Sequence, residues 1–152
     1  MQEAGMGAGA RPAYGRGGMG IARTYALVFG IAYIAVALLE VITKKKGLEI
    51  GGATILSFTG LQNAIHWIVG IVVLGSFFAG ENAARMVARI IGVVFVILTI
   101  YGFVAAKSLG DLLGFPGKIP MSYNIVHLLT AILALFAGFF AARAYGQDRV
   151  AA

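Results

Sequence analysis

The chain has 152 residues, of which 60% are hydrophobic and only 12% are charged. A soluble domain carries about 25% charged residues, so this composition excludes a surface that faces water on all sides. Cysteine is absent, which excludes disulfides and thiolate metal sites. The net charge of +6 comes from basic residues scattered over the termini and loops, a pattern that favours lipid head groups over nucleic acid.

The first twenty residues are rich in glycine and poor in large apolar side chains. Such a segment cannot bury enough apolar surface to offset its ordering entropy, so we expect residues 1–20 to form a flexible tail. A second, short tail is expected over 146–152.

Four apolar runs follow, at about residues 24–43, 61–80, 86–106 and 122–142. Each is about 20 residues long, the length of helix that crosses roughly 30 Å of hydrocarbon. The fold is therefore predicted to be all-α, an integral membrane four-helix bundle over residues 21–145.

Long and short connections alternate between these runs. The connection 43–60 is long, and its second half, "IGGATILSFTG", is expected to lie among lipid head groups or to extend the second helix. The short link "AGENAAR" makes the second and third helices antiparallel neighbours. Pro116 and Pro120 predict turns in the last long connection.

The alternation suggests an internal duplication. The segment "ARTYALVFGIAYI" (22–34) aligns with "ARMVARIIGVVFV" (84–96), matching Gly30 with Gly92 and Tyr33 with Phe95. We therefore interpret the bundle as two repeated helical hairpins. Glycines inside the helices are expected to allow close packing; they are Gly30, Gly70, Gly75, Gly92 and Gly138.

The two histidines of the chain occur in matching places, in the pairs Asn63 with His66 and Asn124 with His127. Three residues apart on a helix, each pair lies on one face. If the hairpins repeat, the two imidazoles lie at similar depths in the membrane.

Glu40 lies near the end of the first run, where an ionised carboxylate is costly and marks a functional or partnered site. Either imidazole would be a natural partner, and Gly102 occupies the corresponding place in the second hairpin. An intramembrane polar network is therefore predicted, formed by Glu40, Asn63, His66, Asn124 and His127.

Three functions are compatible with these residues. The first prediction is a non-enzymatic accessory or scaffolding subunit of a membrane complex, in which the polar residues hydrogen-bond between helices. The alternatives are an electron carrier with haem b ligated by His66 and His127, and a proton-coupled small-solute transporter centred on Glu40. No catalytic residues are recognised, and two imidazoles with one carboxylate supply too few ligands for a metal site.

Lysine and arginine placement favours both termini in the cytoplasm, with arginines predominating on that side. The expected location is the bacterial plasma membrane, and the expected partners are lipids together with a homo-oligomer or a larger membrane complex.

The "N-x-x-H" entering the second helix and the later "IPMSYNIVHLL" resemble a family of small bacterial four-helix membrane proteins, common in actinobacteria and catalogued as a domain of unknown function. The resemblance covers about residues 22–142. In that family a glycine usually follows the histidine by four residues, as Gly70 does here, whereas Ala131 stands in the second copy. The resemblance implies the four-helix fold and a plasma-membrane location, and it implies no particular activity.

Overall fold

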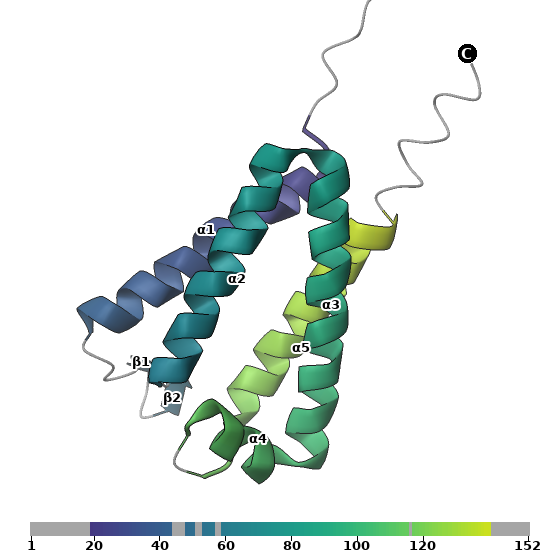
Figure 1. Cartoon of the computed structure of the whole chain (residues 1–152). Coiled ribbons are helices and arrows are strands. Elements are labelled where there is room, and N and C mark those ends of the chain that lie inside the picture. The colour runs from purple at the N-terminus through teal and green to yellow at the C-terminus, as the bar shows by residue number, and fades with distance from the viewer. Residues whose placement is uncertain (1–18, 44–47, 51–52, 57–58, 116, 141–152) are drawn as a thin grey trace, which may run out of the picture.

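Four long helices dominate the part of the chain that the computed structural model describes (Figure 1). They are α1 (Ile21–Ile42), α2 (Gly60–Ala79), α3 (Glu81–Val104) and α5 (Met121–Leu135), the last continuing into the π-helical turn η1 (Phe136–Phe140). All four are long and apolar enough to span a membrane, which confirms the predicted all-α membrane bundle. The described residues are 19–43, 48–50, 53–56, 59–115 and 117–140.

The helices are arranged as two antiparallel pairs, α1 with α2 and α3 with α5. The pairs meet where α2 turns into α3, and Figure 1 shows them diverging toward the opposite end. We call the first the terminal end, because α1 begins and η1 ends there, and the second the connection end, because α4 and the β1–β2 hairpin lie there.

The terminal end is held by a single turn and a carboxylate. Gly80, with φ of +104°, is the one residue between α2 and α3. Glu81 then accepts hydrogen bonds from the backbone N–H groups of Ala22 (3.2 Å) and Arg23 (3.1 Å). A carboxylate at these unpaired N–H groups stabilises the start of α1 and opposes its dipole, so α3 caps α1.

The connection end contains a short antiparallel hairpin of β1 (Leu48–Ile50) and β2 (Ala53–Leu56). The expectation that this segment extends the second helix is therefore wrong. The helix begins only at Gly60, because the Thr59 side chain caps it by accepting a hydrogen bond from the Gln62 N–H at 3.1 Å.

A short helix absent from the sequence prediction, α4 (Ala106–Leu113), lies in the last connection. It ends at Gly114, whose φ of +80° is the left-handed conformation that glycine adopts easily. The Thr59 hydroxyl donates a hydrogen bond to the Leu113 carbonyl at 2.6 Å, which ties the end of α4 to the start of α2.

The helix bounds differ from the predicted ones mainly at α3, which begins at Glu81 and not near residue 86. The prediction missed this first turn because it contains the charged residues Glu81 and Arg85, which lie outside the apolar run. The predicted tails, 1–20 and 146–152, fall almost entirely outside the described residues.

Small residues line the contacts within each pair. A β-carbon added at Gly30 would lie 2.7 Å from the backbone nitrogen of Leu74, and one at Gly92 would lie 3.1 Å from that of Leu135. Gly70 and Gly138 also meet neighbouring helices closely, whereas Gly75 has open space and does not serve packing as predicted. The duplication itself stays a prediction, although these matched contacts are what it would produce.

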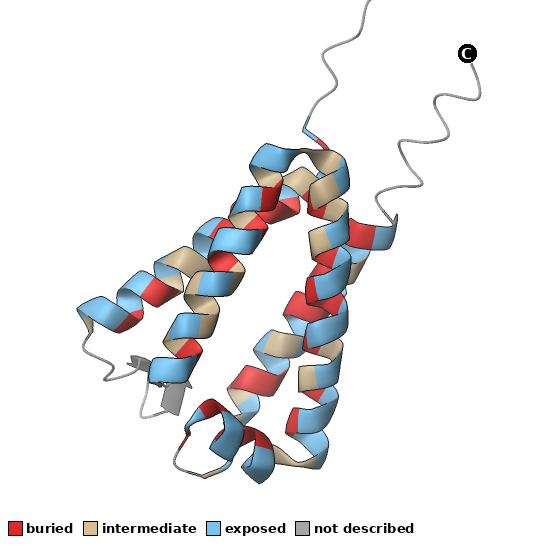
Figure 2. Cartoon of the chain, in the orientation of Figure 1, coloured by how far each residue is buried: buried red, intermediate tan, exposed pale blue. Residues whose placement is uncertain are grey.

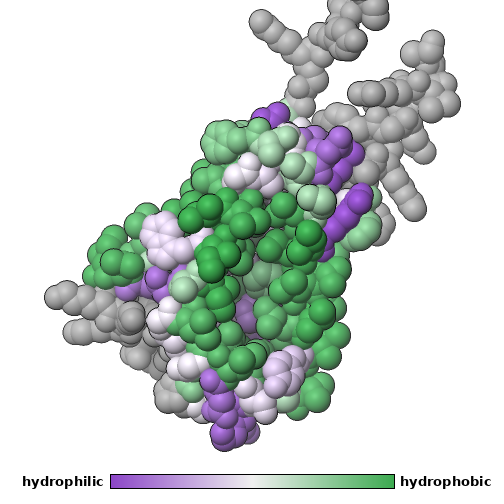
Figure 3. All heavy atoms as spheres, in the orientation of Figure 1, coloured by the Kyte–Doolittle hydropathy of each residue, from purple (hydrophilic) through white to green (hydrophobic). Residues whose placement is uncertain are grey.

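Large apolar side chains cover the outer faces of the helices, and the buried positions turn inward (Figure 2). The exposed apolar surface extends over the middle of the molecule, with hydrophilic side chains at its two ends (Figure 3). This distribution is the reverse of a soluble protein and suits hydrocarbon.

Replacing Gly30 with Ala should lower the free energy of unfolding by about 1–3 kcal/mol, because the new methyl group must push the Leu74 backbone away. Gly75→Ala is the matched control, since it adds the same group to open space on the partner helix and should be neutral or stabilising by up to about 1 kcal/mol. Unfolding of both variants in mixed detergent micelles measures this. Equal effects would contradict the packing described.

Candidate functional site

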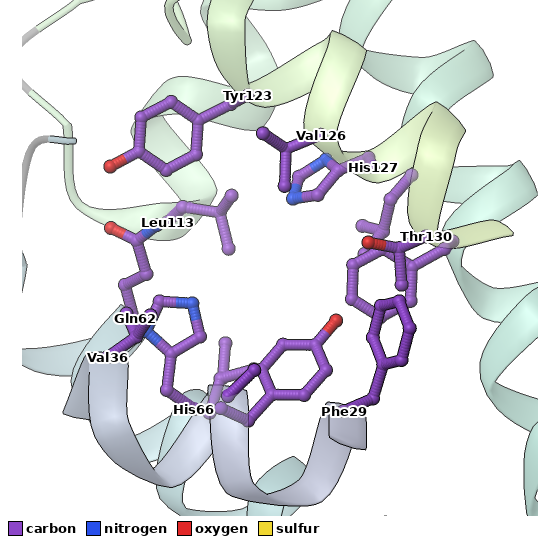
Figure 4. Close-up of a pocket in the computed structure, with 14 residues that line it drawn as sticks. Phe29, Val36, Gln62, His66, Leu113, Tyr123, Val126, His127 and Thr130 are labelled. Carbon is purple, nitrogen blue, oxygen red and sulfur yellow. The ribbon is translucent and has the colours of Figure 1, made fainter. Parts of the chain in front are cut away.

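A cavity of about 220 Å³ lies between the two helix pairs toward the connection end. All five α-helices contribute to its lining, and Leu113 of α4 forms part of the wall. Most of the lining is apolar. The polar lining residues are Tyr33, Gln62, His66, Tyr123, His127 and Thr130 (Figure 4).

Glu40 of α1 is fully buried and pairs with His66 of α2. The Oε1 atom of Glu40 lies 3.0 Å from Nδ1 of His66, whose side chain is 16% exposed. The other carboxylate oxygen, Oε2, has no hydrogen-bond partner among the described residues. The imidazole is therefore oriented by a carboxylate on its far side and presents its remaining edge to the cavity.

Charge neutrality in a buried site favours a pair that holds one shared proton. An ionised Glu40 beside a neutral imidazole would leave a net buried charge, whereas a pair sharing a proton is neutral overall. With Nδ1 engaged by Glu40, the neutral pair leaves the hydrogen on Nε2 of His66. His66 then offers the cavity a hydrogen-bond donor.

His127 of α5 lies on the opposite wall, and Figure 4 shows both imidazoles pointing into the cavity. Its ring packs edge-on against Phe95, with centroids 5.2 Å apart, and the Nδ1 atom has no hydrogen-bond partner within the described segments. His66 has the matching neighbour Tyr33, at 5.9 Å between centroids. The two histidines thus occupy similar settings, and of the two only His66 has a carboxylate partner in the described part of the chain.

The two asparagines take different roles. Asn63 donates from Nδ2 to the Ala37 carbonyl at 2.9 Å, which joins α2 to α1 beside the Glu40 pair. Asn124 is buried against Gly102, in the space that a side chain at residue 102 would occupy. Neither asparagine lines the cavity. The predicted network is therefore divided, with Glu40 joined to His66 and His127 facing them across the cavity.

Several lining residues were missed by the sequence prediction. Gln62 is only 5% exposed. Thr130 of α5 interacts with Tyr33 of α1. Gln62 directly precedes Asn63, so its polarity in an apolar run was a usable signal. No signal in the sequence marked Leu113, because α4 reaches the cavity only through the tertiary fold.

Groups of three or more potential ligands close enough to hold a metal ion do not occur in the portion of the chain that is described. The arrangement instead supplies a donor, a second imidazole and an apolar wall. An apolar cavity with a few placed polar groups has the general features of a small-molecule site.

Four membrane-spanning helices around a partly polar cavity define the class, a multi-pass membrane protein. Residues 23–140 match the model of a family described as Domain of unknown function (DUF4383), and the chain belongs to this family. No curated protein matches the chain, and no solved structure does. The predicted resemblance to a family of unknown function is confirmed to this extent, while the actinobacterial distribution and the family role of the N-x-x-H pairs stay predictions.

Nitrogen NMR of the protein labelled at its two histidines should show a protonated Nε2 and a hydrogen-bonded Nδ1 for His66. This follows from the neutral Glu40 pair. His127→Phe removes one set of signals and so assigns the other. A bare Nε2 on His66, with its hydrogen on Nδ1, would mean that the pair carries a net negative charge and would contradict the shared proton.

Proposed function

We propose that the protein is a non-enzymatic integral membrane protein that binds a small molecule in the cavity between its helices. The observation that carries this proposal is the convergence of His66 and His127, from different helix pairs, on one cavity that also has apolar walls. A proton shared between Glu40 and His66 would make this site a proton-linked one.

A purely structural role accounts for this arrangement less well. Helix-to-helix polar contacts stabilise a bundle when their groups are paired, as Asn63 is. Oε2 of Glu40 and Nδ1 of His127 are buried without a partner in the described chain, and buried polar atoms are normally satisfied. This cost is understandable where a ligand enters.

The cavity volume bears on the haem alternative. At about 220 Å³ it is smaller than the roughly 300–1,000 Å³ of pockets that enclose drug-sized ligands. Haem b between His66 and His127 would require the helix pairs to move apart. The geometry therefore favours a smaller ligand.

The role of an accessory subunit stays a prediction, because the apolar outer faces suit lipid and partner helices alike. A bacterial plasma-membrane location with cytoplasmic termini is also part of this proposal. Arg23, Arg85 and Arg89 lie at the terminal end, and Lys107 and Lys118 toward the connection end. Arginine and lysine enrichment on the cytoplasmic side supports this orientation.

Phenol is a suitable probe for the cavity. Ala32 is exposed on α1 and lines the cavity, whereas Ala35 is exposed on the same helix and does not. Ala32→Phe should fill the cavity and weaken phenol binding at least about tenfold, while Ala35→Phe should leave it unchanged. Saturable uptake into nanodiscs, measured above that of protein-free nanodiscs, gives the affinities. A wild-type protein without saturable uptake, or equal affinities for the two variants, would overturn the proposal.

Proton-coupled transport is a finer form of the same proposal. In that form the shared proton crosses with the solute, so Glu40→Gln should abolish flux in proteoliposomes. The rate of internal acidification after an external pH drop, with phenol present, measures this against protein-free vesicles. An unchanged rate would exclude coupling at Glu40.

A further inference from the structure

The walls of the cavity indicate the chemical class of its ligand. Between the two imidazoles stand the rings of Tyr33 and Phe95, whose centroids are 6.2 Å apart. Tyr33 contacts His66, and Phe95 contacts His127. One side of the cavity is therefore a row of four rings that begins and ends with an imidazole.

We propose that this site binds the head of a membrane quinone, a flat apolar ring with oxygen acceptors at opposite ends. The inference rests on the proposed binding function and adds the ligand class. A flat ring can pack along Tyr33 and Phe95, as aromatic groups do on one another. Its two oxygens then point toward the two ends of the row.

Hydrogen-bonding capacity agrees with this choice. In a neutral Glu40–His66 pair, His66 presents an Nε2–H donor to the cavity. A neutral His127 also carries one N–H. Carbonyl oxygens only accept hydrogen bonds, so each quinone oxygen suits one imidazole. Lysine and arginine do not occur among the lining residues. An anionic ligand would therefore lack a counter-charge, and a neutral one is favoured.

The route into the cavity favours a ligand from the bilayer. The space-filling view shows a hollow between the apolar side chains of α2 and α3, with a hydrophilic residue at its floor (Figure 3). At the connection end, Leu113 of α4 lines the cavity and its carbonyl accepts a hydrogen bond from Thr59. The hollow is bordered by side chains that face lipid, so an apolar tail could remain in the bilayer while the ring occupies the cavity.

The test compares two probes of similar shape, 2-methyl-1,4-naphthoquinone and 2-methylnaphthalene, which differ in the two oxygens. Two hydrogen bonds at about 1 kcal/mol each predict at least tenfold tighter binding of the quinone. Saturable uptake into nanodiscs holding the full chain, above protein-free nanodiscs, measures both affinities.

His127→Phe keeps a flat ring at the site and removes one donor. It should weaken binding of the quinone about fivefold and leave that of methylnaphthalene unchanged, with Ala35→Phe as the control that alters neither. Adding the quinone to wild-type protein should also shift the His66 Nε2 signal in nitrogen NMR, a readout that survives if the variant fails to fold.

The possible outcomes distinguish failure of the quinone assignment from failure of the proposed binding function. Preference for the quinone that is lost in His127→Phe supports the inference. Equal affinities for the two probes would overturn the quinone class and leave the binding function standing. Absence of saturable binding for both probes and for phenol would overturn the binding function itself.

Discussion

The structure depends on one buried pair, the carboxylate of Glu40 and the imidazole of His66. A carboxyl group with no exposed surface in a membrane helix must have a partner, and His66 is that partner at 3.0 Å. The pair sets the rotation of α1 against α2, and the Asn63 bond to the Ala37 carbonyl supports the same register. With both helices so oriented, Tyr33 and His66 face the second helix pair.

The cavity follows from where small and large residues lie along the helices. Near the terminal end, Ala22, Ala26, Ala84 and Ala88 are buried and allow close approach. Further along, the facing side chains are aromatic rings and imidazoles, and Tyr33 and Phe95 meet at 6.2 Å. Close contact at one end and bulky side chains toward the other agree with the divergence of the pairs in Figure 1. A space remains where four rings cannot fill it, and both helix pairs contribute polar groups to its walls.

The two halves resemble each other in their contacts and differ in chemistry. In the predicted alignment of the two hairpins Gly102 corresponds to Glu40, and Asn124 occupies the space beside Gly102. Among the described residues His127 has no carboxylate partner to hold its proton or fix its tautomer. An asymmetric site of this kind suits a ligand whose two ends receive different hydrogen bonds.

Local patterns in the sequence predicted the helices and a partnered Glu40. The length of an apolar run and a lone carboxylate within it are both visible in neighbouring residues. The sequence left either histidine as the partner of Glu40, and in the structure the partner is His66. Other features depend on chain-distant contacts. Glu81 caps α1 from the start of α3, Leu113 reaches the cavity from α4, and Gly75 faces open space although its spacing resembles that of the packing glycines. Such contacts are set by tertiary packing, which overrides local preference.

A double-mutant cycle of Glu40→Gln and His66→Gln tests the central claim most directly. Unfolding free energies of the wild type, both single variants and the double variant, measured in the same micelles, give the coupling between the two side chains. A buried pair on which the helix register depends should show a coupling of at least about 1 kcal/mol. Single effects that add to within about 0.5 kcal/mol would show that the two groups do not interact and would contradict the account.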